Sequence, residues 1–175
     1  MIGRIFLTAA ALLLPAAASA QDAAKPIEEA AADLAYGFCP LFLAGQFPLT
    51  GNPQLTALGF GDTVEKQANA RFGELQVVSA RRADGELSFG GAPEKTCSVV
   101  VAGDKRDAAL KMLHTNMEYM GLDFKPATDA KVPTVPGVTV ETFKAPVEGQ
   151  FLYVQLIQAG GATPIVSAQL FAMDQ

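Results

Sequence analysis

The stretch LQVVSARRADGELSF, residues 75–89, decides the fold class of this chain. Two β-type runs flank Asp84-Gly85, and an Asp-Gly pair in that position is the strongest short-range signal for a β-hairpin. The stretch therefore predicts two antiparallel strands. We expect the adjacent cations Arg81 and Arg82 to form the solvated end of the first strand.

Four further segments have β-strand character. Residues 97–102 form a continuous apolar run, which is typical of a strand buried near the middle of a sheet. The last third of the chain contains three more β-rich segments separated by turn residues, at 138–144, 151–159 and 164–173. Together with the hairpin, these segments predict five to six strands.

A long helix is predicted ahead of the last three strands, at residues 104–120. Asp104 is a good N-cap residue, and Gly121 is a good left-handed stop. The apolar stripe on the inner side of this helix consists of Leu110, Leu113, Met117 and Met120. The proline-rich piece that follows, residues 126–137, is predicted to be a surface crossover loop, with a lid as the alternative.

The chain after residue 20 begins with helical segments. An amphipathic helix is predicted to start at Pro26 and to end or kink at Pro40, because proline fits the first turn of a helix but breaks its interior. Asn52-Pro53 is expected to be the N-cap and the first residue of a short helix.

A pair that resembles a capping box, Asp62 and Glu65, predicts a further helix that ends at Gly73. The predicted order of elements is therefore helices, three strands, a helix and three strands. The fold class that follows is α+β: a single, largely antiparallel sheet of five to six strands with one long helix packed on a face and an N-terminal helical segment. The sequence shows no internal repeat and no second-domain boundary.

The N-terminus has the three-part pattern of a secretory signal peptide. The cation Arg4 precedes an apolar run of about ten residues, which is shorter than the roughly 20 residues that a membrane-spanning helix needs. The motif ASA at residues 18–20 fits the cleavage rule. We therefore expect residues 1–20 to be removed and residues 21–175 to form a single mature globular domain. This domain would be periplasmic or secreted, with no membrane span after cleavage.

The chain is acidic, with a formal net charge of -5 at pH 7. A protein of this charge has no general affinity for phosphate backbones or for anionic lipids. We therefore expect a soluble protein that does not bind nucleic acid.

The chain contains two cysteines, Cys39 and Cys97. In an oxidising compartment an even number of cysteines indicates a disulfide, and two buried free thiols are the alternative. A reactive thiol is not favoured, because both residues lie in apolar segments that raise the pKa of a thiol, and neither belongs to a CxxC motif.

Two residues are weak candidates for a functional site. His114 is the only histidine, so any mechanism that needs a histidine must use it, but a half-buried residue at the helix boundary is its ordinary role. Arg71 lies near the C-terminal end of a predicted helix. It could bind a carboxylate there, or its positive charge could simply interact favourably with the helix dipole. One histidine and two distant cysteines do not supply a zinc site, and we expect no metal and no cofactor.

No set of residues in the chain matches a known catalytic motif. The sequence therefore favours an exported envelope protein with a non-catalytic binding or accessory role, whose partner is an envelope protein or a small apolar ligand. A pocket for such a ligand is expected between the sheet and the methionine-containing helix. The alternative is a small periplasmic hydrolase that uses His114 or an unidentified carboxylate site.

Overall fold

The computed structural model describes residues 25–128 and 135–174. The predicted signal peptide, residues 1–20, lies outside this part of the chain, as does the middle of the predicted loop at 126–137. Within the described ranges, no helix is long and apolar enough to cross a membrane.

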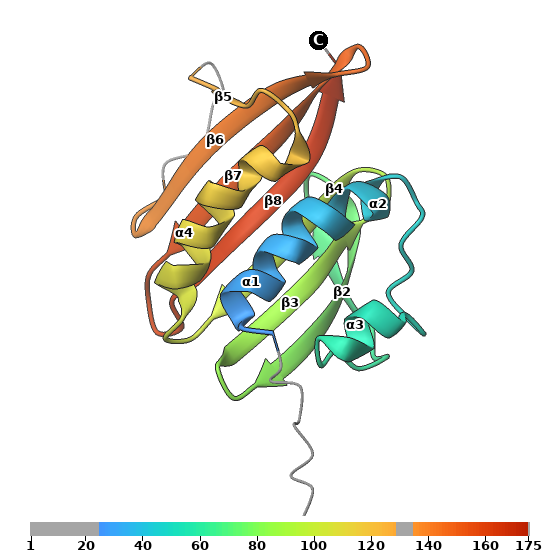
Figure 1. Cartoon of the computed structure of the whole chain (residues 1–175), viewed down its shortest axis with the longest axis vertical. Coiled ribbons are helices and arrows are strands. Elements are labelled where there is room, and N and C mark those ends of the chain that lie inside the picture. The colour runs from blue at the N-terminus through green and yellow to red at the C-terminus, as the bar shows by residue number, and fades with distance from the viewer. Residues whose placement is uncertain (1–24, 129–134, 175) are drawn as a thin grey trace, which may run out of the picture.

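All strands belong to one eight-stranded antiparallel sheet (Figure 1). Their order across the sheet is β1-β2-β3-β4-β8-β7-β6-β5, so β1 and β5 are the edges and the last strand, β8, lies in the middle. The strands are β1 (Glu65–Asn69), β2 (Gly73–Arg82), β3 (Gly85–Ala92), β4 (Thr96–Ala102), β5 (Lys125–Pro126), β6 (Val138–Val147), β7 (Gln150–Ala159) and β8 (Ile165–Asp174).

Two long helices and one short helix accompany the sheet. The first long helix is continuous over α1 (Ile27–Asp33), the π-helical turn η1 (Leu34–Phe38) and α2 (Cys39–Leu43). The short helix is α3 (Pro53–Ala57), and the second long helix combines α4 (Arg106–Asn116) with the 3-10 turn η2 (Met117–Met120). Lys105, rather than the predicted Asp104, occupies the N-cap position of α4.

The predicted fold class is wrong in two respects: the sheet has eight strands rather than five or six, and two long helices rather than one accompany it. β1 takes the place of the helix predicted from Asp62 and Glu65. Asp62 therefore caps no helix, and its carboxylate instead accepts a hydrogen bond from the Gly51 N–H at 2.9 Å. β1 is a polar edge strand, in which Lys66 pairs with Glu74 of β2 at 2.9 Å, so it lacks the apolar alternation that identifies a strand.

The first helix continues through Pro40, where the sequence predicted an end or a kink. The turn just before it, η1, is π-helical, and the Cys39 N–H donates to the Leu34 carbonyl five residues earlier. A wider turn relieves the clash between a proline ring and the carbonyl four residues before it, and Pro40 has no N–H to leave unpaired. The helix therefore extends to Leu43.

The two long helices lie side by side and share a buried hydrogen bond. The Tyr36 hydroxyl in η1 donates to the Leu113 carbonyl in α4 at 2.6 Å. Burial raises the pKa of the Tyr36 phenol, which keeps its proton available for this bond. Four residues after Leu113, at Met117, the second helix tightens from α to 3-10 geometry. A wide turn in one helix thus faces a tight turn in the other.

The chain repeats one pattern, in which a long helix precedes a four-stranded meander. The two meanders end with β4 and β8, which pair with each other in antiparallel orientation. The halves are therefore related by an approximate two-fold axis that passes between β4 and β8. The sequence hides this repeat, because the halves share the arrangement of their elements rather than their residues.

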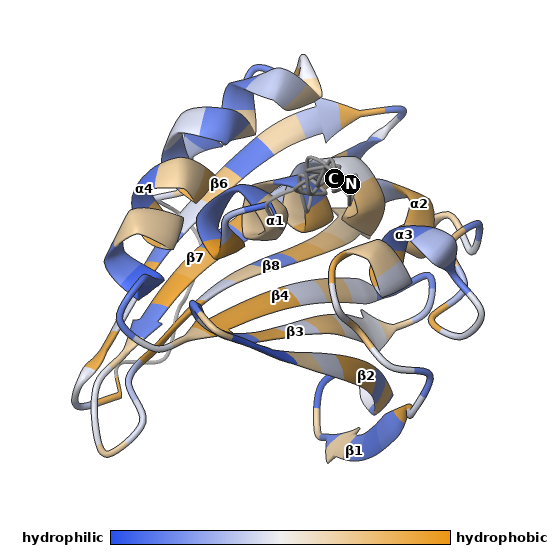
Figure 2. Cartoon of the chain, turned by 60° about the horizontal axis from the view of Figure 1, so that its bottom comes forward, coloured by the Kyte–Doolittle hydropathy of each residue, from blue (hydrophilic) through white to orange (hydrophobic). Residues whose placement is uncertain are grey.

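Both long helices and the segment around α3 lie on one side of the sheet, the helix side (Figure 2). Leu113 and Met117 of the second helix are buried there against sheet residues such as Val99 and Leu156. The other two members of the predicted stripe, Leu110 and Met120, are half-buried. Packed side chains fill much of the space between the sheet and this helix, and a cavity remains near the N-terminal end of α4, lined by residues such as Leu110, Thr139 and Gln158.

A disulfide joins Cys39 to Cys97, as predicted, and so fastens the first long helix to β4. Both residues are fully buried, with 0% of their surface exposed. The link closes a long stretch of chain, since the two cysteines are 58 positions apart.

Candidate functional site

The sheet has a second face, which we call the open face because the helices lie on the other side (Figure 2). In the middle of the sheet, Val99 and Ala168 point to the helix side, so their chain neighbours Ser98 and Gln169, which also pair with each other, point to the open face. Many side chains of this face are half-buried, as is usual for one solvated face of an antiparallel sheet.

Four aromatic rings of the open face form a continuous cluster near one end of the strands. The Tyr153 and Phe171 rings are stacked with their centroids 5.4 Å apart and an interplanar angle of 4°. Phe151 contacts Tyr153 at 6.4 Å, and Phe72 contacts Phe171 at 5.9 Å. With two cations, described next, these rings form the cation–aromatic ladder: Arg71, Phe72, Phe171, Tyr153, Phe151 and Lys144.

A cation lies near each end of this ladder. The Arg71 guanidinium carbon is 4.6 Å from the Phe171 ring centroid and 4.9 Å from that of Phe72. The Lys144 ammonium lies 5.1 Å from the Phe151 centroid. These distances are within the range of a cation–π attraction, so the rings help to hold both charges in place.

The sheet curls toward the open face near Phe72. Phe72 precedes β2, yet its ring reaches Phe171 on β8, although β3 and β4 lie between these strands. Gly90 in β3 permits a close approach of β2, because a Cβ atom at this position would lie 2.0 Å from the Gln76 carbonyl oxygen, and its φ of +146° favours glycine. The open face is therefore concave at this end.

Arg71 lies in the turn between β1 and β2, and the helix that was predicted around it is absent. The Asn69 side chain shapes this turn by accepting hydrogen bonds from the backbone N–H groups of Arg71 at 2.9 Å and Phe72 at 3.0 Å. One guanidinium N–H donates to the Met173 sulfur at 3.5 Å. Within the described ranges, no ion pair joins Arg71 to a carboxylate.

The charge of the open face differs from that of the whole protein, which is -5. Strand register places both cations and anions on this face. The cations of its strands and of the β1–β2 turn are Arg71, Arg81, Lys125 and Lys144, and the anions of its described strands are Glu65 and Glu86. Lys125 forms an ion pair with Asp123 at 2.7 Å, and Arg81 lies opposite Glu86, so the remaining positive charge comes mainly from Arg71 and Lys144. An acidic protein therefore presents a locally basic surface.

His114 lies on the helix side, away from the ladder. Its Nε2 is 3.3 Å from a carboxylate oxygen of Glu141 on β6, and its ring meets the Phe143 ring edge-on at 5.7 Å. The side chains of His114 and Glu141 are 37% and 43% exposed. Glu141 could not be identified as a candidate from the sequence, because its contact with His114 depends on how the helix is placed over β6.

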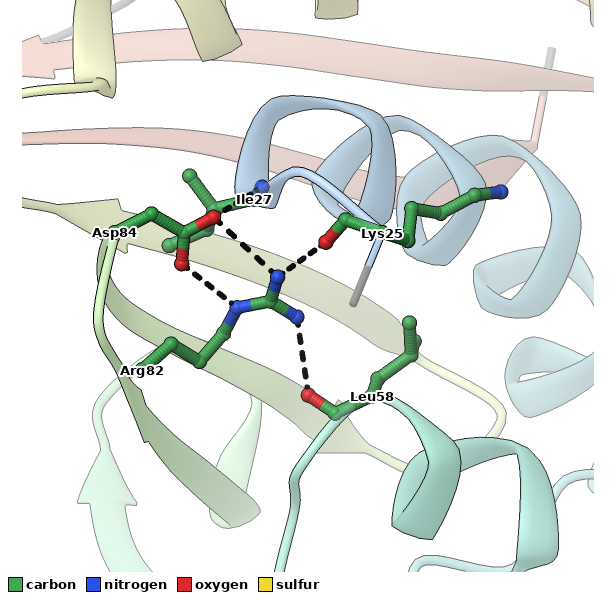
Figure 3. Close-up of polar contacts among 5 residues, drawn as sticks. All are labelled: Lys25, Ile27, Leu58, Arg82 and Asp84. Carbon is green, nitrogen blue, oxygen red and sulfur yellow. Dashed lines mark hydrogen bonds and ion pairs between the residues drawn. The ribbon is translucent and has the colours of Figure 1, made fainter. Parts of the chain in front are cut away.

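Arg82 contradicts the prediction of a solvated strand end, because its side chain is only 9% exposed. Its guanidinium donates to Asp84 Oδ1 at 2.9 Å, to the Leu58 carbonyl at 3.1 Å and to the Lys25 carbonyl (Figure 3). Asp84 in turn accepts from the Ile27 N–H at 2.8 Å, at the N-terminus of α1. We call these two side chains the Arg82–Asp84 anchor, since they fasten α1 and α3 to the β2–β3 hairpin.

The anchor makes stability depend on pH. The hydrogen bond from Arg82 is the main cause that lowers the pKa of Asp84 below its usual range. The carboxylate therefore stabilises the fold above the ordinary aspartate pKa of about 3.9, and this contribution is lost as pH falls through the lower pKa of the folded state.

We expect Asp84→Asn to destabilise the protein at pH 7, and the deficit to shrink as pH falls below about 3.9. Urea unfolding of both proteins between pH 7 and pH 3 measures the difference. A deficit that is the same at every pH would show that the charge of Asp84 contributes nothing.

The described residues thus bring together three arrangements: the ladder on the open face, the His114–Glu141 pair and the Arg82–Asp84 anchor. Among these residues, no group of three or more His, Cys, Asp or Glu side chains could hold a metal ion. Comparisons of the chain with protein-family models, curated proteins and solved structures give no match, so its function is inferred from this geometry alone.

Proposed function

We infer that this protein is a non-catalytic binding protein of the cell envelope, and that its open face receives an extended, negatively charged ligand. The observation that carries this proposal is the cation–aromatic ladder, which sets two fixed cations on one face of an acidic protein. Such a local charge attracts anions that the protein as a whole repels.

Arg71 is the residue that we expect to contribute most. A guanidinium has five N–H groups, and among the described residues the side chain that accepts a hydrogen bond from Arg71 is Met173. Stacking against Phe72 and Phe171 fixes the plane of the group, so less freedom is lost when an anion binds. The planar fork suits a carboxylate, which it can bind with two parallel hydrogen bonds.

The location in the envelope rests on two observations. The sequence predicts a signal peptide at residues 1–20, and a buried disulfide is typical of proteins from oxidising compartments. The periplasm or the exterior of the cell is therefore the proposed location. We do not propose a small apolar ligand, because charged and polar side chains, Arg106, Asp107 and Gln158, contribute to the lining of the cavity between the second helix and the sheet.

A hydrolase that uses His114 stays an alternative prediction. The His114–Glu141 contact is the feature that favours it, since a carboxylate can orient a catalytic histidine. The pair lacks a thiol nucleophile, because both cysteines form the disulfide. The His114 ring also contacts the Phe143 ring, which does no acid–base chemistry.

Binding to immobilised poly-L-glutamate, followed by interferometry, tests the proposed function. Wild-type protein is expected to bind, and to bind more weakly as salt rises. We expect Arg71→Met to weaken binding about tenfold, because a hydrogen bond to a charged group contributes roughly 1.5 kcal/mol or more. Methionine keeps a long side chain over the Phe171 ring, so the melting temperature reports whether the fold is intact.

Arg106→Met is the matched control. Arg106 belongs to α4 on the helix side and lies 3.5 Å from Asp107, so its loss should leave binding unchanged. Absence of binding, or equal loss in both variants, would overturn the proposal. A hydrolytic activity that His114→Gln abolishes while the fold is kept would favour the alternative instead.

A further inference from the structure

The open face also carries a line of hydroxyl and amide side chains beside the ladder. Strand pairing places them on β2, β3, β4, β8, β7 and β6 in turn, so the line crosses the six inner strands of the sheet. At the usual spacing of about 4.8 Å between strands, it is roughly 24 Å long. We call it the polar track: Ser79, Ser88, Ser98, Ser167, Gln169, Gln155 and Thr142.

Neighbouring members of the polar track contact one another at both ends. The Ser79 and Ser88 hydroxyl oxygens are 2.9 Å apart, and the Gln155 amide donates to the Thr142 hydroxyl at 3.3 Å. These four residues are half-buried, so solvent reaches them, whereas Ser167 in the middle of the polar track is buried. A hydroxyl can donate once and accept twice, and an amide has two donors and a carbonyl, so each keeps capacity for a ligand.

The approximate two-fold axis gives the polar track a similar cation at each end. On β2, Arg81 lies two residues from Ser79 and therefore on the same face, where it is opposite Glu86 of β3. On β6, Lys144 lies two residues from Thr142, again on the same face. A ligand along the polar track thus meets neutral hydrogen-bonding groups in the middle and positive charge near both ends.

We propose that the polar track binds an acidic polysaccharide, a chain of sugars that carries carboxylates. This inference rests on the proposed function and names its ligand class. The hydroxyl groups of sugars both donate and accept, as do the side chains of the polar track, and the carboxylates complement the cations. The neighbouring rings of Phe72, Tyr153 and Phe151 add an apolar, half-exposed surface of the kind that excludes water around such contacts, whereas the Phe171 ring is buried.

The edges of the sheet argue for a glycan over an acidic peptide. An extended peptide commonly binds by adding a strand to a free edge. Here one edge is β1, a short strand with charged side chains, and the other is the two-residue β5, which contains Pro126. Both features discourage strand addition, so the open face rather than an edge is the surface available to a ligand.

The test compares immobilised polygalacturonate with immobilised poly-L-glutamate, which carries carboxylates but no hydroxyl groups. The double variant Thr142→Val/Gln155→Leu removes one hydrogen-bonded pair from the polar track. We expect it to weaken polygalacturonate binding about tenfold, which corresponds to about 1.4 kcal/mol, and to leave polyglutamate binding unchanged.

The matched control is Thr139→Val/Gln158→Leu. Thr139 and Gln158 also pair across β6 and β7, but they lie on the helix side, so neither polymer should be affected. Equal binding of both polymers, unchanged in the Thr142/Gln155 variant, would overturn the assignment to polysaccharides and favour acidic polypeptides, while the proposed function would stand. Failure to bind either polymer would overturn the proposed function as well.

Discussion

Removing the disulfide with Cys39→Ala and Cys97→Ala is expected to lower the free energy of unfolding by about 4 kcal/mol. The bond closes a loop across a separation of 58 residues, and the chain-entropy model assigns roughly this value to a loop of that length. For a domain of about 150 residues, the melting temperature should fall by roughly 8 to 16 °C. Urea and thermal unfolding of the double variant measure both quantities.

Reduction of the wild-type protein provides the control. Both cysteines are fully buried, so a reductant should leave the folded protein unchanged and should act only once urea exposes the bond. In urea with reductant, the wild type should then unfold at the same midpoint as the double variant. A variant as stable as the oxidised wild type would show that the disulfide contributes nothing to stability.

The second large effect is expected from Arg82→Met, which should lower the free energy of unfolding by about 3 kcal/mol. The substitution leaves Asp84 without its ion pair and removes the donor from the Leu58 and Lys25 carbonyls. Breaking one partner of a mostly buried, hydrogen-bonded ion pair costs about this much. Urea unfolding gives the value, and amide exchange should show that the N-terminus of α1 becomes less protected.

Arg81→Met is the comparison for this prediction. Arg81 is the preceding residue of the same strand, but it is exposed on the open face, so its replacement should change stability by about 0.5 kcal/mol or less. Similar losses in the two variants would show that the Arg82–Asp84 anchor has no special role.

Local patterns predicted the individual elements well. The hairpin around Asp84 exists, and Gly121 ends the second helix with a φ of +67°. The Asn52 side chain caps α3 by accepting from the Gln54 N–H at 3.0 Å, as expected of an asparagine followed by proline. Each of these features is decided within a few residues of chain, which is why the sequence reveals it.

The order of the strands could not be predicted in the same way. β8 pairs with β4, from which it is separated by the second helix and three strands. Nothing in the sequence of either strand indicates which strand it will pair with. The polar edge strand β1 was missed for a related reason, because it has no buried side to produce an apolar alternation. The predicted number of strands was therefore too low.

The candidate site depends on this long-range order. The ladder joins residues from the β1–β2 turn, β8, β7 and β6, so its rings meet only after the whole sheet is assembled. The burial of one arginine of the pair Arg81-Arg82 could have been predicted from the sequence. Adjacent residues of a strand point to opposite faces, so a neighbouring pair of arginines had to place one cation on each side.

The position of β8 also affects the order of events in folding. β4 is an apolar strand in the middle of the sheet. It pairs with β3 on one side and with β8, the last strand, on the other. Until synthesis reaches residue 174, β4 has an unpaired apolar edge, and the N-terminal meander is an incomplete, aggregation-prone sheet. Pairing across so long a separation forms slowly, so the chain spends time without its native sheet. A protein built in this way acquires its open face only as its last strand is inserted.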